Sequence, residues 1–115
     1  MKRLLYAAWN SLKGLGACVK EEKAFRVEIA FFILFLGSSC FFGFSKRAYL
    51  EITCGFFLIF ITELLNSGLE KLGDRITKKN DPLIAYAKDV GSAAVFLAII
   101  LTIYITVHHG IEKIC

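Results

Sequence analysis

Proline is scarce in this chain, and charge is absent from three long runs. Pro82 is the only proline, so nothing else in the sequence breaks a helix by removing a backbone donor. No charged side chain occurs in residues 29–45, 52–62 or 90–107. Uncharged runs of this kind lack the apolar and polar alternation of a barrel strand, and only helices or closed barrels satisfy their backbone groups in lipid. The sequence therefore predicts an all-α membrane protein.

The overall composition points in the same direction. Hydrophobic residues make up 57% of the 115 residues and the mean hydropathy is +0.61, whereas soluble domains are usually about 45–50% apolar. A membrane-spanning helix needs about 20 mostly apolar residues, so the middle uncharged run must extend into its polar neighbours. We predict a single domain, residues 1–115, with an amphipathic surface helix at 2–20 and transmembrane helices at about 27–44, 49–70 and 84–107.

Several familiar kinds of site are missing. The sequence has no GxxxxGK[ST] motif and no GxGxxG motif behind a strand, so any use of ATP requires a different architecture. No nucleic-acid partner is expected. His108 and His109 are adjacent and do not share a helix face, which makes them a poor pair of metal ligands. The cysteines form no CxxC pair and are interpreted as small apolar residues of the bundle; they are Cys18, Cys40, Cys54 and Cys115.

The distribution of positive charge predicts an orientation in the membrane. Six cations precede the first expected span and five more lie in residues 71–88, between the second and third spans. The outer side would carry only Lys46, Arg47 and Lys113. The positive-inside rule then places the N-terminus in the cytoplasm and the C-terminus on the outer side. The surface helix would lie at the interface, with Trp9 at headgroup level and its cations near anionic lipid.

A stripe of polar residues ends the second expected span. Its members are spaced i, i+3, i+4, i+7 and i+11, so they share one helix face: Glu63, Asn66, Ser67, Glu70 and Asp74. The inner end of the third span carries a second polar group, Lys88, Asp89 and Ser92. Carboxylates beside a bilayer are costly and suggest function. Several of them in a poorly hydrated place repel one another unless a cation such as Mg²⁺ is present. The alternative is that these residues only pair with one another between helices.

Four segments carry a resemblance to a known family. ELLNSGLEKLGDRI (63–76), AKDVGSAAV (87–95), EEKAFRVE (21–28) and KGL (13–15) closely resemble the prokaryotic diacylglycerol kinase family of small integral-membrane lipid kinases. The resemblance implies ATP- and Mg²⁺-dependent phosphorylation of diacylglycerol to phosphatidic acid at the cytoplasmic side of the bacterial inner membrane. It also implies a homotrimer whose active sites share residues between subunits.

The resemblance further implies a role for individual residues. Glu63 would be the general base, and Glu22 and Glu70 would hold Mg²⁺. The positions implied to bind ATP are Arg3, Asn10, Glu22, Asn66, Glu70, Lys79, Asn80, Asp81, Lys88 and Asp89. Those implied to lie at the lipid substrate are Arg3, Glu28, Glu63 and Ser92, and Asp74 would be a structural polar residue. Asn10 and the segment KND (79–81) depart from the residue types usual in the family.

Two other functions remain open from the sequence. One is an undecaprenol kinase of the same fold, in which the catalytic residues are the same and only the acceptor lipid differs. AFRVE (24–28) and GSAAV (91–95) resemble the diacylglycerol branch more closely. The other is a non-catalytic membrane scaffold in which the polar face only holds the helices together.

Overall fold

All the regular secondary structure that the structure describes is helical. The structure, a computed structural model, describes residues 1–114, and Cys115 lies outside the described residues. The elements are α1 Lys2–Glu21, α2 Lys23–Phe42, α3 Lys46–Ile76 and α4 Pro82–Ile114. No strand occurs within residues 1–114. The predicted all-α architecture is confirmed.

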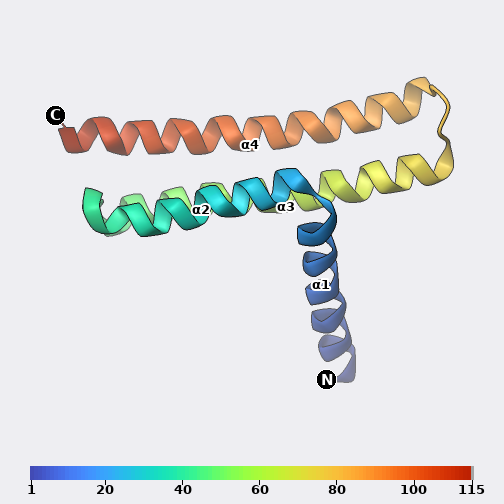
Figure 1. Cartoon of the computed structure of the whole chain (residues 1–115), viewed down its shortest axis with the longest axis horizontal. Helices are drawn as coiled ribbons and strands as arrows, with labels where there is room; N and C mark the ends of the chain where they lie inside the picture. Colours follow the sequence, from blue (N-terminus) through green and yellow to red (C-terminus); the bar gives the residue numbers. More distant parts are fainter. Residues whose placement is uncertain (115) are drawn as a thin grey trace.

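Helix α1 stands apart from the other three. Figure 1 shows α2, α3 and α4 running side by side while α1 leaves them at a steep angle. Its large apolar side chains, including Leu4, Leu5, Trp9 and Leu12, are exposed. They line one face of an amphipathic helix, which is the arrangement of a helix that lies on a membrane surface.

The corner between α1 and α2 is a single residue. Glu22 has an extended backbone, with φ −103° and ψ 109°, and separates two otherwise continuous helices. Arg26 stabilises this corner, because its Nη1 atom donates hydrogen bonds of 2.8 Å to the carbonyl oxygens of Val19 and Lys20. These are among the last carbonyls of α1, which have no partner within the helix. The expected gap between the surface helix at 2–20 and the span from about 27 is therefore reduced to a one-residue break.

Helices α2, α3 and α4 are each long and apolar enough to cross a membrane. α3 and α4 extend beyond the expected spans of 49–70 and 84–107. Ser45 caps α3 by accepting a hydrogen bond from the amide of Ala48 at 3.1 Å. α4 begins at Pro82, where the missing amide proton costs nothing. The polar stripe keeps the helical repeat of the apolar run before it. The helices therefore continue past the residues at which the uncharged runs stop.

The core has two parts, both built on α3. Helix α3 packs along α4 on one side and against α2 on the other. Between α2 and α3, the rings of Phe32 and Phe56 lie 5.2 Å apart and those of Phe25 and Phe60 lie 5.8 Å apart. Between α3 and α4, a Cβ atom at Gly55 would lie 2.7 Å from Thr102 Oγ1, so the two backbones approach closely at this point. The polar stripe of α3 is therefore held by helices on both sides.

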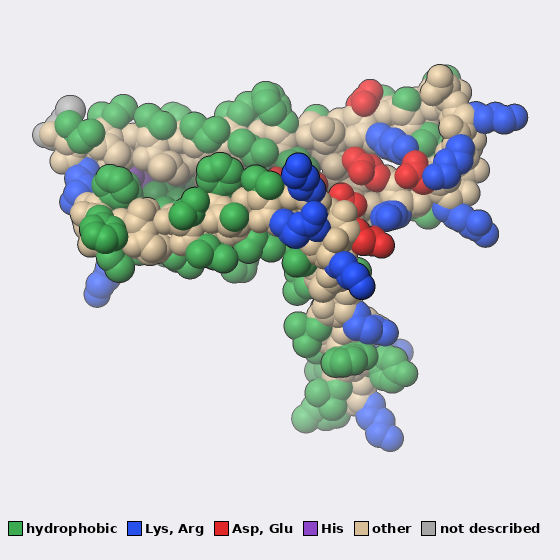
Figure 2. All heavy atoms as spheres, viewed as in Figure 1, with side chains coloured by type: hydrophobic (Ala, Val, Ile, Leu, Met, Phe, Trp, Pro, Cys, Tyr) green, Lys and Arg blue, Asp and Glu red, His purple; other side chains and the backbone are tan. Residues whose placement is uncertain are grey.

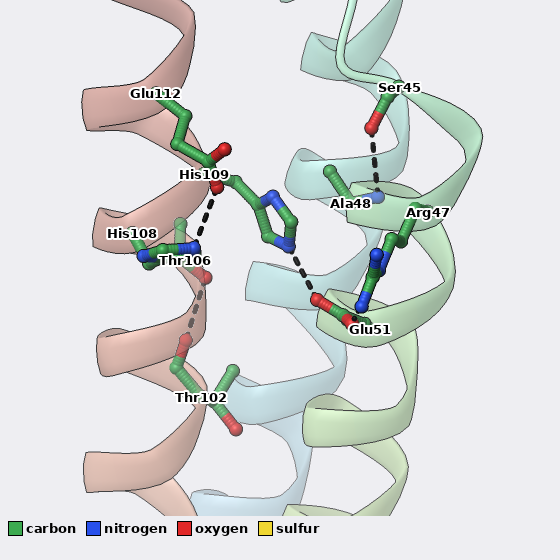
Figure 3. A network of polar contacts seen from close by, with 9 residues as sticks. All are labelled: Ser45, Arg47, Ala48, Glu51, Thr102, Thr106, His108, His109 and Glu112. Carbon is green, nitrogen blue, oxygen red and sulfur yellow. Dashed lines mark hydrogen bonds and ion pairs between the residues drawn. The ribbon is translucent and has the colours of Figure 1, made fainter.

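At the end of the bundle that holds the α2–α3 turn, polar contacts join α4 to α3 (Figure 3) and to the residue that ends α2. His109 Nε2 lies 2.6 Å from Glu51 Oε1, and Glu51 also pairs with Arg47 at 3.3 Å. Lys113 donates a 2.9 Å hydrogen bond to the carbonyl oxygen of Gly43, which ends α2 in the left-handed conformation. His108 instead pairs with Glu112 on its own helix. The two histidines thus contact different carboxylates.

Candidate functional site

Acidic side chains from three parts of the chain meet around Glu63. Its carboxyl group has Glu28 of α2, Glu22 of the corner and Glu70 of α3 as neighbours, and Glu63 is only 7% exposed. Figure 2 shows acidic side chains gathered where α1 leaves the bundle and along the adjoining half of α3 and α4, flanked by Lys and Arg side chains. The other half of that face is mostly hydrophobic. The cluster therefore lies next to an apolar, membrane-like surface.

Glu22 reaches this cluster through contacts with α3. Ser67 Oγ donates a 2.9 Å hydrogen bond to Glu22 Oε1. Beside it, Lys71 and Glu21 form an ion pair at 3.4 Å. The sequence placed Ser67 on the polar stripe but assigned it no role. The available signal for a role of Ser67 was its place on the stripe next to Asn66. Its partner Glu22, 45 residues away, could not be predicted from helical spacing.

Asn66 lies between the two acidic positions of α3. Its Nδ2 atom donates a 3.4 Å hydrogen bond to Glu70 Oε1, one turn further along the helix. The side chain is 7% exposed, and its Oδ1 atom has no hydrogen-bond partner within the described chain. Glu28 Oε1 is in the same situation. Since buried polar atoms are nearly always paired, two unsatisfied oxygens in one cluster indicate a place where a ligand or water would bind.

Lys88 brings α4 to the site. Its Nζ atom lies 2.6 Å from Asp74 Oδ1, and the two side chains are 37% and 44% exposed. A partly exposed pair of this kind adds little to stability, because water screens the two charges. Because an ammonium group has three donors, Lys88 can hold Asp74 and still donate to an anion. Pairing between helices was the alternative that the sequence left open for these polar residues.

The remaining predicted positions are not brought to the cluster within a single chain. Arg3 and Asn10 are exposed on α1, Lys79 and Asn80 are exposed in the α3–α4 connection, and Asp89 and Ser92 are exposed on α4. Asp81 caps α4, since its Oδ1 atom accepts hydrogen bonds from the amides of Leu83 and Ile84. Asp89 differs from Lys88 because adjacent helical residues point about 100° apart. The roles of all these residues stay predictions.

The acidic pair Glu22 and Glu70 suits Mg²⁺ by its donor chemistry. Within residues 1–114, no three His, Cys, Asp or Glu side chains lie together as a ready set of metal ligands. Mg²⁺ does not need such a set, because it is usually bound by one or two carboxylates together with waters and substrate phosphates. Ser67 and Asn66 each hold one oxygen of these two carboxylates. The residues present therefore fit a magnesium ion that arrives with a nucleotide.

Cys18 is a neighbour of the cluster that the sequence interpretation treated as apolar filling. Burial raises the pKa of its thiol; the hydrogen bond to Ser67 lowers it, and the charges of Glu22, Glu63 and Glu28 raise it further. Because the thiolate is the nucleophile, we expect iodoacetamide to alkylate Cys18 more slowly at pH 7 in the folded protein than in the unfolded chain. Peptide mass spectrometry measures both rates. Equal rates would contradict the buried position.

The chain matches a known protein family over most of its length. The sequence profile of the family described as prokaryotic diacylglycerol kinase matches residues 9–108. The chain belongs to the prokaryotic diacylglycerol kinase family. The match includes the whole cluster around Glu63 and the Lys88 region, and it leaves out Arg3 at the start of α1. Membership makes the chain a lipid kinase, which disfavours the scaffold alternative.

Curated members of the diacylglycerol kinase family agree with this assignment over most of their length. The diacylglycerol kinase of Escherichia coli K12 is 37% identical over 101 residues, which cover 88% of this chain and 83% of the relative. That of Pseudomonas aeruginosa PAO1 is also 37% identical over 101 residues, covering 86% and 80%. That of Haemophilus influenzae Rd is 34% identical over 99 residues, covering 86% and 84%.

Proposed function

We propose that this chain transfers the γ-phosphoryl group of ATP to the free hydroxyl of diacylglycerol and so forms phosphatidic acid. The observation that carries the proposal is the buried Glu63, which has three acidic neighbours and lies on a helix long and apolar enough to cross a membrane. A lipid hydroxyl remains near the membrane surface, so a base at the inner end of a spanning helix can reach it without extracting the lipid.

The residues of the cluster divide the chemistry between them. Glu63 accepts the proton of the lipid hydroxyl as general base. Mg²⁺ held by Glu22 and Glu70 would supply the charge neutralisation that phosphoryl transfer requires. Ser67 and Asn66 orient those two carboxylates through the hydrogen bonds at 2.9 and 3.4 Å. Lys88 places a positive charge beside the nucleotide phosphates, and Asp74 holds it on α3 at 2.6 Å.

Several predicted nucleotide and lipid positions are exposed in the single chain, which favours an active site completed by another subunit. Asp89 and Ser92 follow Lys88 on α4 and are exposed. We propose that these two residues, together with Arg3, Asn10 and the segment 79–81, contact ATP or lipid bound at a neighbouring subunit of a homotrimer. Glu28 would shape the acceptor side of Glu63.

The site would face the cytoplasm of a bacterial inner membrane. Six cations lie in residues 2–26, and five more lie in residues 71–88. The positive-inside rule then puts the acidic cluster on the side where ATP is available. The outer end, with His109 and Glu51, would lie on the opposite side together with the C-terminus.

The test is a comparison of acceptor lipids. Purified protein in mixed micelles receives labelled ATP, Mg²⁺ and equal mole fractions of diacylglycerol and undecaprenol, and the products are separated by thin-layer chromatography. We expect phosphatidic acid to be the main product. Preferential labelling of undecaprenol would overturn the choice of acceptor and favour the polyprenol kinase of the same fold.

A further inference from the structure

The contact between α3 and α4 depends on glycines that make room for a larger side chain on the facing helix. On α3, Gly55 faces Thr102 and Gly73 faces Ile84 of α4. At the level of the acidic cluster the order is reversed, because the glycine is Gly91 of α4 and the larger residue is Asn66 of α3. At this level, therefore, the space left by a glycine is filled by a polar side chain of the site.

The requirement at Gly91 is for space and not for backbone conformation. Within residues 1–114 only Gly43 has a positive φ, so the helical backbone of Gly91 would accept any residue other than proline. A Cβ atom at Gly91, however, would overlap Asn66 Oδ1 and would lie 3.3 Å from Asn66 Cγ. Gly91 is itself buried in the helix contact. An added methyl group can be accommodated only if the carboxamide of Asn66 moves.

The position of this carboxamide is set more by packing than by hydrogen bonds. The bond from Nδ2 to Glu70 Oε1 is long, at 3.4 Å, and Oδ1 has no partner among the described residues. Asn66 is nevertheless 7% exposed, so its side chain is enclosed by its neighbours. Gly91 is the neighbour that faces Oδ1 most closely.

We infer that Gly91 is a positioning residue for the kinase reaction. The missing side chain at position 91 lets the carboxamide of Asn66 lie where it can hold Glu70, and Glu70 is thereby kept ready for the divalent cation. This inference rests on the proposed function, in which Glu70 is a metal ligand and Asn66 lies at the nucleotide. The inference adds Gly91 of α4 to the proposed site as a residue that contacts neither ATP nor diacylglycerol.

The direct test is Gly91→Ala. The clash falls on the end of one side chain, so rotation of Asn66 relieves it and the helices stay folded. We expect the kcat for diacylglycerol phosphorylation to fall roughly 10- to 100-fold, as for other small misplacements of a site group. We also expect Mn²⁺ binding, measured by electron paramagnetic resonance in the presence of ATP, to weaken about tenfold. A Gly91→Ala protein with wild-type Mn²⁺ affinity and turnover would overturn the inference.

Gly55→Ala is the matched control. It creates an equally close contact in the same helix pair, with Thr102 Oγ1 at 2.7 Å, but about three turns of α3 away from Asn66. We expect it to lower the melting temperature while leaving Mn²⁺ affinity unchanged. If Gly55→Ala and Gly91→Ala weakened Mn²⁺ binding by the same factor, general loosening of the helix contact would explain both, and the role of Gly91 would be rejected.

A double-mutant cycle shows whether Gly91 acts through Asn66. Asn66→Ala removes the group that the new methyl would strike, so Asn66→Ala/Gly91→Ala should fold and should match Asn66→Ala in Mn²⁺ affinity. If Gly91→Ala weakened Mn²⁺ binding by the same factor in the Asn66→Ala protein as in the unmodified protein, the inference would be overturned. The cation measurement needs no acceptor lipid. A protein that binds Mn²⁺ and ATP as expected but does not phosphorylate diacylglycerol would contradict the proposed function and leave the role of Gly91 standing.

Discussion

Replacing Glu63 with glutamine is expected to lower the rate of diacylglycerol phosphorylation by roughly 10²- to 10⁴-fold, the usual contribution of a general base. Glutamine keeps the size of the side chain and removes its ability to accept a proton. The side chain is buried among Glu28, Glu22 and Glu70, so removing one negative charge should not weaken the fold. Initial rates at saturating ATP and lipid measure the loss, and size-exclusion chromatography in detergent measures assembly.

Glu112→Gln provides the control for this experiment. Glu112 is also a glutamate of a long helix, but it pairs with His108 near the C-terminal end of α4, away from the acidic cluster. We expect normal turnover from this variant. If Glu63→Gln instead kept its activity while the oligomer dissociated, the polar cluster would serve only to hold the helices together, and Glu63 would not be the base.

Replacing Glu70 with glutamine is expected to change the dependence on magnesium more than the chemistry. Loss of the carboxylate charge should raise the Mg²⁺ concentration needed for half-maximal rate by roughly 10- to 100-fold. The amide oxygen of glutamine can still accept the hydrogen bond from Asn66, which spans 3.4 Å in the native protein. High Mg²⁺ should therefore restore part of the activity. Rates measured over a range of Mg²⁺ concentrations at saturating ATP show this directly.

Glu21→Gln is the matched control for the metal ligand. Glu21 is adjacent to Glu22, but its partly exposed carboxylate pairs with Lys71 at 3.4 Å. We expect its magnesium titration to match that of the unmodified protein. An unchanged titration in Glu70→Gln would remove Glu70 from the set of metal ligands, whereas a shift in both variants would indicate a general effect of negative charge at the corner.

Local chemistry was sufficient to predict the helices and the composition of the site. Long uncharged runs require helices in lipid, and α4, which begins at Pro82, contains the whole span expected at about 84–107. The stripe from Glu63 to Asp74 follows from helical periodicity alone, because its members belong to one helix. Its buried part, Glu63 and Asn66, was therefore predictable as one face before any packing was known.

Contacts between helices were not predictable in the same way. The hydrogen bond from Ser67 to Glu22 joins residues 45 positions apart and depends on the corner that Arg26 stabilises. The contact between His109 and Glu51 spans 58 positions. Neither follows from spacing, since a helical repeat says which residues share a face but not which face a second helix meets.

The sequence by itself thus determined the four helices, their apolar spans and the polar stripe, because each depends on neighbours within a few turns. The tertiary structure alone decided that Glu22 and Glu28 join Glu63, that Lys88 but not Asp89 meets α3, and that Gly91 leaves space for Asn66. The physical reason is that these contacts depend on the relative rotation and separation of whole helices. Those quantities result from packing along the full length of α3 and α4.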